Sequence, residues 1–247
     1  MSNVIRIFWM YPDILNLHGD RGNVQALEYT AKLMGLPVEI EKVINPQDEA
    51  ELDRADLLIF NPGELKVCDR IARALRPRRE ALDSYFDRGG AALVIGTSGT
   101  IFGQVVERQD GSCFEGLGYL DIHADERRMI LGNDLYVILP DGTELMGSQI
   151  QMAEYTVPAE QALGKVAYGH GNKNDGTEGA KVGNLIYTNL LGPVLVKNPW
   201  WAAQMLASIA ERRGMTYRMP DRADFELEYA SLDAVKAYIE LKKENKD

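Results

Sequence analysis

The chain has 247 residues, of which 45% are hydrophobic, and its formal net charge is -10. A chain of this length can bury a sizeable core, and we expect one domain over 1–247 with a helical tail from about 220 to 247. The negative charge disfavours nucleic acid as a partner, because it repels phosphates. The sequence contains no apolar run of about 18 residues and begins without the layout of a signal peptide, so we expect no membrane insertion and a cytoplasmic location.

Two cysteines occur, Cys68 and Cys113, and they are far apart in the sequence. They form no CxxC pair or Cys/His cluster, so we predict free thiols and neither a disulfide framework nor a zinc site. His123 has no second histidine at metal-ligand spacing. We therefore expect no metal and no cofactor.

The first half of the chain alternates apolar runs with helical patterns. Residues 4–9 and 55–60 are rich in β-branched and aromatic or aliphatic residues and predict buried strands, while 37–43 alternates like an edge strand. Helices are predicted at about 24–34 and 71–88. Residues 91–95 form another apolar strand, which a small-residue elbow follows.

The second half of the chain has a different sequence pattern. Segments around 129, 135–139 and 165–168 are separated by Gly, Asn and Asp turns and predict antiparallel strands added to the sheet. Residues 169–183 predict one long irregular loop. Apolar spacing predicts further helices at 200–213 and 232–243.

These elements predict an α/β fold with three layers: a doubly wound, mostly parallel sheet with added antiparallel strands. In such a sheet, ligands bind at the carboxyl ends of the strands, near the switch in strand order. Three loops are expected to converge there: 17–23, 61–64 and 96–100.

Several long motifs occur in order along the chain. They read YPDILNLHGDRGN, FEGLGYL, GHGNKNDGTEGAKVGN and LLGPVLVKNP. From about residue 4 to 206 the chain resembles the CobB/CobQ-type class I glutamine amidotransferases, most closely the GatD type. The resemblance implies the fold predicted above. It also implies a glutaminase subunit that partners the Mur-ligase-like protein MurT in amidating lipid II.

Two residues of this chain depart from what the resemblance implies for catalysis. Active members carry a cysteine nucleophile at the elbow, where this chain reads Ile95-Gly96-Thr97-Ser98. They also carry a catalytic histidine before Gly-Pro, where this chain has Leu191. Neither Gly96 nor Leu191 can perform nucleophilic or acid–base chemistry.

A third departure concerns the turn that supplies oxyanion donors in the family. This chain has Asn61-Pro62-Gly63-Glu64 there, and proline has no N–H to donate. The resemblance leaves Gly63 as a candidate for binding substrate. Arg128 lies near the family's arginine for the glutamine carboxylate, but the neighbouring Arg127 leaves the register open, as does a plain surface role.

Each of the other candidate residues has two possible roles. Thr97 or Ser98 could replace the nucleophile with His18 as base, and Cys113 is either a structural thiol or a substitute nucleophile. His170 either contacts a ligand or is solvated. The loop 19–23 either caps the first helix or contacts a ligase partner.

We therefore carry three hypotheses from different classes. The first is a catalytically degenerate GatD-like subunit that acts as the non-catalytic partner of a Mur-ligase-like (MurT-like), ATP-dependent amide ligase. The second is an active glutaminase or amidotransferase with a substitute nucleophile. The third is a sensor that binds glutamine or another small amino acid in the vacated pocket, which the missing side chain at Gly96 would enlarge.

Overall fold

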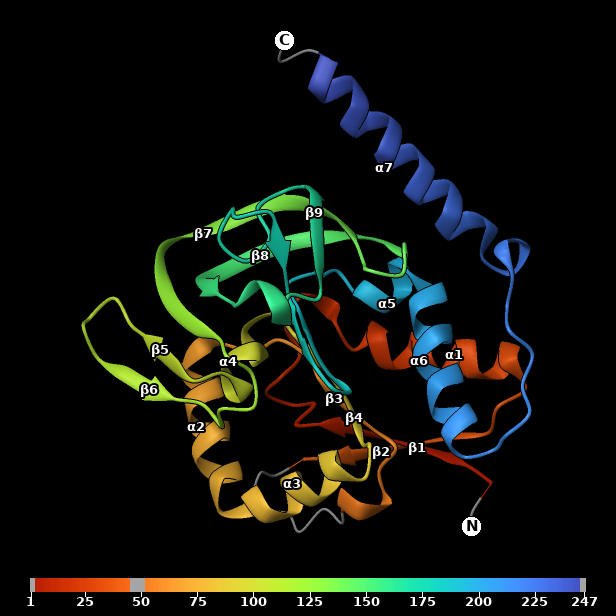
Figure 1. The fold of residues 1–247 in the computed structure, drawn as a ribbon, viewed down its shortest axis with the longest axis horizontal. Helices are drawn as coiled ribbons and strands as arrows, with labels where there is room; N and C mark the ends of the chain where they lie inside the picture. The colour runs from red at the N-terminus through yellow and green to blue at the C-terminus, as the bar shows by residue number, and fades with distance from the viewer. Residues whose placement is uncertain (1–2, 45–51, 245–247) are drawn as a thin grey trace.

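The structure, a computed structural model, describes residues 3–44 and 52–244. A six-stranded sheet at its centre has the order β11-β12-β4-β3-β1-β2 (Figure 1). Its strands are β1 (Ile5–Met10), β2 (Val38–Val43), β3 (Leu57–Phe60), β4 (Ala91–Ile95), β11 (Ala180–Val182) and β12 (Leu185–Thr188). All neighbours pair in parallel except β11 and β12. The predicted α/β fold with a doubly wound, mostly parallel sheet is confirmed.

Helices cover both faces of this sheet because its strands are buried on both sides. Along β3, Leu57 and Ile59 point into one core, while Leu58 and Phe60 point into the other. The first core is covered by α1 (Gly22–Met34), α5 (Val194–Lys197) and α6 (Pro199–Arg212). The second is covered by α2 (Leu65–Leu75), α3 (Arg79–Asp87) and α4 (Gly99–Phe102).

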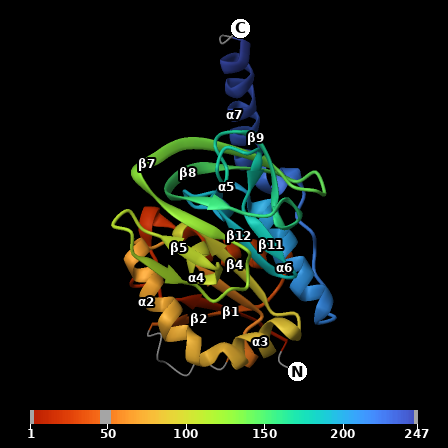
Figure 2. The same cartoon turned by 60° about the vertical axis from the view of Figure 1, so that its left-hand side comes forward.

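A second sheet contains most of the predicted antiparallel strands. Its strands are β5 (Val105–Glu107), β6 (Cys113–Glu115), β7 (His123–Ile138), β8 (Glu144–Thr156), β9 (Gly164–Tyr168) and β10 (Thr177–Glu178). The long β7 pairs with β8 along most of its length, so the two strands satisfy each other's backbone hydrogen bonds. Among the described strands, β11 is the one that extends the central sheet in the antiparallel sense. Figure 2 shows β7 and β8 lying over the central sheet. There, β8 contacts the turn that follows β4.

Two predicted elements differ from the structure. The prediction of a single helix at 71–88 is wrong in two respects. The helix α2 begins earlier, at Leu65, and a 3-10 turn separates it from α3. Pro77 lies in that turn, and its missing N–H removes a helical hydrogen bond. The irregular loop expected at 169–183 is also partly wrong, since it contains β10 and β11.

The last helix, α7 (Glu226–Glu244), projects away from the body (Figure 1). It begins before the predicted 232–243, after a turn whose start Asp221 caps. Tyr229 stacks on Trp200 of α6 with ring centroids 4.3 Å apart, and Lys236 lies 2.7 Å from Glu144 of β8. Within the two described ranges, no helix combines the length and the apolar character needed to cross a membrane.

Close packing at Gly99 predicts a specific loss of stability. A Cβ atom at Gly99 would overlap the buried ring of Tyr187, so Gly99→Ala should lower the free energy of unfolding by about 2 kcal/mol. The matched control is Gly132→Ala on β7, where a Cβ atom would meet nothing within 4 Å. Urea unfolding followed by circular dichroism checks this. Equal stabilities of the two variants would contradict the packing seen at α4.

Candidate functional site

The turn after β4 has the geometry of a tight elbow. The chain leaves β4 at Ile95 and enters a 3-10 turn, Gly96–Ser98, which leads directly into α4. Gly96 has a φ of 57°, in the left-handed region that residues with a Cβ atom rarely adopt. The strand–turn–helix predicted around Gly96 is therefore present.

Three residues from separate segments meet at this elbow. A Cβ atom at Gly96 would lie 3.1 Å from Leu191 Cδ2 and 3.2 Å from Pro62 Cβ. Leu191 is 1% exposed, and an isolated antiparallel bridge joins it to Ser148 of β8. The structure thus brings Gly96 and Leu191 together, although they are far apart in the sequence. The space that the missing side chain would occupy is bounded closely by Leu191 and Pro62.

Buried hydrogen bonds connect the elbow to the turn that follows β3. The Thr97 hydroxyl donates to the carbonyl oxygen of Gly63 at 2.6 Å and accepts from the backbone N–H of Gly63 at 3.1 Å. The Ser98 hydroxyl donates to the carbonyl oxygen of Asn61 at 2.6 Å. Two of the three predicted loops are therefore locked together.

These bonds argue against the substitute nucleophiles. A hydroxyl nucleophile needs a base that takes its proton, yet both protons are already donated to backbone carbonyls. Both side chains are buried, with exposed fractions of 4% for Thr97 and 0% for Ser98. His18 is exposed, and within the described chain it makes no hydrogen bond to either hydroxyl.

The two cysteines are free, as predicted, but occupy different surroundings. Cys113 is exposed on β6. Cys68 of α2 is fully buried, and α2 packs against the elbow. Burial raises the pKa of Cys68 to about 11, so it stays a thiol at neutral pH. The sequence offered no signal for this placement.

Gly63 does not offer its backbone N–H to a ligand, because Thr97 accepts it. A Cβ atom at Gly63 would lie 2.6 Å from Leu15 Cδ2, so a larger residue would displace the turn. Together with Pro62, which has no N–H, this removes two of the backbone donors that the turn after β3 could offer to an oxyanion.

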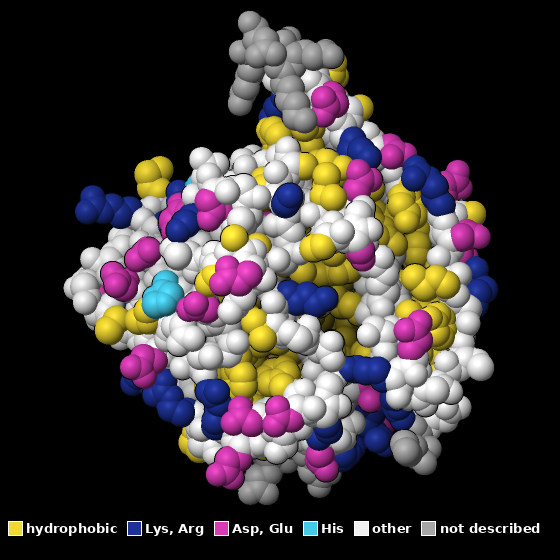
Figure 3. All heavy atoms as spheres, viewed as in Figure 1, with side chains coloured by type: hydrophobic (Ala, Val, Ile, Leu, Met, Phe, Trp, Pro, Cys, Tyr) yellow, Lys and Arg dark blue, Asp and Glu magenta, His cyan; other side chains and the backbone are white. Residues whose placement is uncertain are grey.

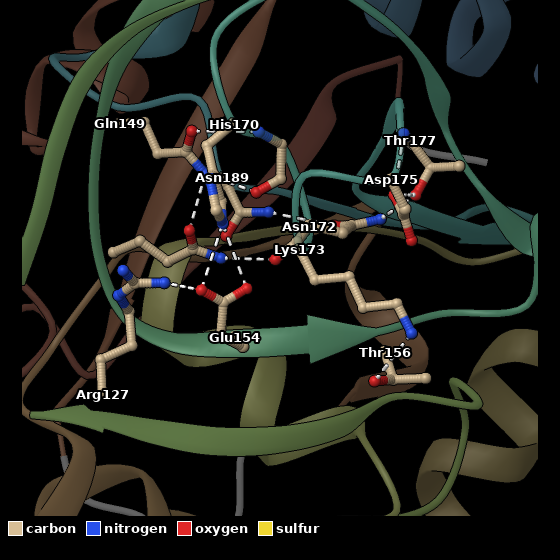
Figure 4. A network of polar contacts seen from close by, with 12 residues as sticks. Arg127, Gln149, Glu154, Thr156, His170, Asn172, Lys173, Asp175, Thr177 and Asn189 are labelled. Carbon is tan, nitrogen blue, oxygen red and sulfur yellow. Dashed lines mark hydrogen bonds and ion pairs between the residues drawn. The ribbon is translucent and has the colours of Figure 1, made fainter.

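The two neighbouring arginines are placed differently. Residues 127–130 lie in an irregularity where the pairing of β7 with β8 shifts register. Arg128 is exposed there, whereas Arg127 is half-buried and forms an ion pair with Glu154. His170 Nε2 lies 3.1 Å from the same carboxylate (Figure 4). Burial and the positive charge of Arg127 lower the pKa of His170, so the neutral imidazole is favoured.

The glycine-rich segment 169–179 is held by a buried polar network (Figure 4). Gln149 exchanges two hydrogen bonds with the backbone of Gly171, and Asn172 exchanges two with the backbone of Gly179. Glu178 is fully buried and accepts from Thr188 at 2.8 Å and from the backbone N–H of Asn189 at 2.6 Å. The network includes Asn189, close to Leu191 in the sequence. It gives the motif at 169–184 a structural role.

The loop after β1 reaches the same edge of the sheet through Asn23. Its amide donates to Asp20 Oδ1 at 3.1 Å and to Asn61 Oδ1 at 3.2 Å, and its oxygen accepts from the Leu195 N–H at 2.9 Å. All three predicted loops therefore converge. The loop 19–23 does more than cap the first helix, because Asn23 also bonds with Asn61 and Leu195.

Within the described residues, no group of three or more His, Cys, Asp or Glu side chains is placed to hold a metal ion. His123 lies 3.6 Å from Asp121 on the surface. The side chains described at this edge offer amides, hydroxyls and two buried carboxyls, Asp20 and Glu178.

Asp20 predicts a pH-dependent stability. Burial raises its pKa to about 7, against about 3.9 in an unfolded chain. Between these values the folded state binds the extra proton, so the contribution of Asp20 to stability falls as pH rises from about 4 to about 7. Compared with the native protein, Asp20→Asn should gain up to about 1.4 kcal/mol per pH unit across that window, measured by urea unfolding.

The matched control, Asp13→Asn, removes an exposed carboxylate from the same loop. A stability difference between Asp20→Asn and the native protein that stays constant from pH 4 to pH 7 would show that Asp20 ionises as freely in the folded protein as in the unfolded chain.

Comparisons with known proteins agree with this architecture. No protein-family profile matches the chain. It is 28% identical over 225 residues to "Lipid II isoglutaminyl synthase (glutamine-hydrolyzing) subunit GatD" of Staphylococcus aureus, covering 91% of each chain. The protein of the same name from Streptococcus pneumoniae is 24% identical over 225 residues, covering 89% of this chain and 86% of the relative.

A crystal structure of a glutamine amidotransferase has a TM-score of 0.53 with this chain at 15% identity. The match covers 85% of this chain and 100% of the other, and it shows the shared fold. We conclude that the chain is GatD-like, with the fold of the class I glutamine amidotransferases.

Proposed function

We propose that this protein is a GatD-like subunit that has lost glutamine hydrolysis and acts as the non-catalytic partner of a Mur-ligase-like, MurT-like amide ligase. The ligase would use ATP to amidate a cell-wall precursor such as lipid II or a related carboxylate. Glycine and leucine stand where the resemblance implies cysteine and histidine.

One observation carries this proposal: Gly96 and Leu191 lie side by side at the carboxyl edge of the sheet, where a Cβ atom at Gly96 would be 3.1 Å from Leu191 Cδ2. Two positions far apart in the sequence that the resemblance pairs as nucleophile and base are therefore neighbours, which supports the assignment of both. A hydrogen atom and an isobutyl group have no lone pair to attack an amide or to move a proton.

The relatives supply the rest of the argument. Both are described as subunits of a glutamine-hydrolyzing lipid II isoglutaminyl synthase, and the similarity covers about nine tenths of this chain. The scaffold is shared over that length while the catalytic pair is replaced, which leaves assembly as the part of a subunit's role that needs no catalysis. We therefore place its function in assembly with a ligase.

Glutamine turnover tests the proposal directly. The purified protein, alone and with its ligase, should release glutamate from glutamine at a rate at least on the order of 10⁴-fold below that of the Staphylococcus aureus relative, because loss of a nucleophile is that costly. The complex should amidate its substrate with ammonium salts but not with glutamine. Sustained glutamate release by the complex would refute the loss of hydrolysis.

A trapping experiment distinguishes the active-enzyme alternative, in which Thr97, Ser98 or Cys113 attacks glutamine. Incubation with diazo-oxo-norleucine should leave the intact mass unchanged, because both elbow hydroxyls are buried and bonded. The Staphylococcus aureus relative serves as the labelled control. An adduct mapped to one of these three residues would favour the active enzyme.

The sensor alternative receives less support from the site. It relied on space created by the absent side chain at Gly96, and Leu191 and Pro62 lie against that space. Arg128, the candidate for holding an amino acid carboxylate, is exposed.

A further inference from the structure

A cavity of about 280 Å³ lies at the other end of the central strands from the elbow. It opens between α6 and the amino-terminal ends of β3, β4 and β12, with Leu139, Asp141 and Leu163 of the second sheet and its loops above it. In the face drawn in Figure 3, a hollow floored by hydrophobic side chains is visible, with Lys and Arg side chains around it. Nothing in the proposed function uses this cavity.

Small side chains on α6 and β4, Ser208 and Ala91, leave room for the cavity. Trp201, Met205, Ser208 and Arg212 follow one another at helical spacing along the face of α6 that lines it. Opposite them, β4 begins with Ala91, whose methyl group leaves the helix–sheet interface underfilled. The deeper walls are apolar and nearly inaccessible: Leu93 is 0% exposed, and Leu57 and Ile209 are 1% exposed.

The rim of the cavity is net positive. Lys181 of β11 and Arg212 of α6 face one acidic residue, Asp141. Asp141 Oδ1 accepts from the backbone N–H of Thr143 at 2.9 Å, and Arg212 donates to the carbonyl oxygen of Gly89. Among residues 3–44 and 52–244, the exposed side chain of Lys181 has neither a hydrogen-bond partner nor an ion-pair partner. An ammonium group without a partner at the mouth of an apolar cavity favours an anion there.

We propose that this cavity binds a small amphipathic carboxylate, whose alkyl body lies between α6 and the sheet and whose carboxylate meets Lys181 and Arg212. The rim also carries the polar side chains of Asn184, Gln204 and Ser208, but the deep walls formed by Leu57, Leu93 and Ile209 have no side-chain donor or acceptor and match an unbranched alkyl chain. The proposal does not depend on whether glutamine is hydrolysed at the elbow, because the two sites lie at opposite ends of the strands.

Octanoate is the probe, titrated into the full chain by isothermal calorimetry. We expect saturable binding with one site, and binding of octanol about tenfold weaker because it lacks the charge. Lys181→Ala should weaken octanoate binding about five- to tenfold and leave octanol binding unchanged. The control, Lys66→Ala, removes an exposed lysine from α2 on the opposite face of the sheet and should leave octanoate binding as in the native protein.

Filling the cavity tests its location. Ala91→Leu places an isobutyl group in the cavity and should abolish binding of both probes, and Ser208→Leu at the exposed edge of α6 is a second blocking variant should Ala91→Leu fail to fold. Absence of saturable octanoate binding, equal affinity for octanol, or unchanged binding by a folded blocking variant would each overturn the proposal.

Discussion

Buried hydrogen bonds between side chains and turns fix the carboxyl edge of the central sheet. The turns that follow β1, β3 and β4 leave backbone groups that water cannot reach, and each such group needs a partner inside the protein. Asn23, Thr97 and Ser98 supply these partners across the three turns. The positions of Gly96 and Leu191 follow from this arrangement, which depends on no catalytic residue.

The same bonds explain how a scaffold of this kind can persist without its chemistry. In a working site, the turns would present a nucleophile, a base and free N–H donors to a substrate. Here the hydroxyls next to Gly96 and the N–H of Gly63 are consumed by the fold, and Leu191 and Pro62 close the space. Under the proposed function, these bonds keep the edge stable without serving catalysis.

Much of the fold could be predicted because local patterns determine it. Continuous apolar runs such as Leu57–Phe60 form strands buried on both faces, and the ends of parallel strands must share one edge, so the meeting of the three loops followed from the sequence. The choice between Arg127 and Arg128 did not follow, because an irregularity in β7 decides which side chain turns inward. The bond of Glu178 with Asn189 and the packing of α2 against the elbow join segments whose contact no local pattern encodes.

The packing at Gly96 also has an evolutionary consequence. A mutation to cysteine there would give a thiol that touches Leu191 and Pro62, with no imidazole to deprotonate it and no complete set of donors for the oxyanion. Under the proposed function, hydrolysis would return only after coordinated replacements at three separate segments, because cysteine at position 96 alone would lack both a base and a complete oxyanion hole. A single substitution would therefore not restore the reaction.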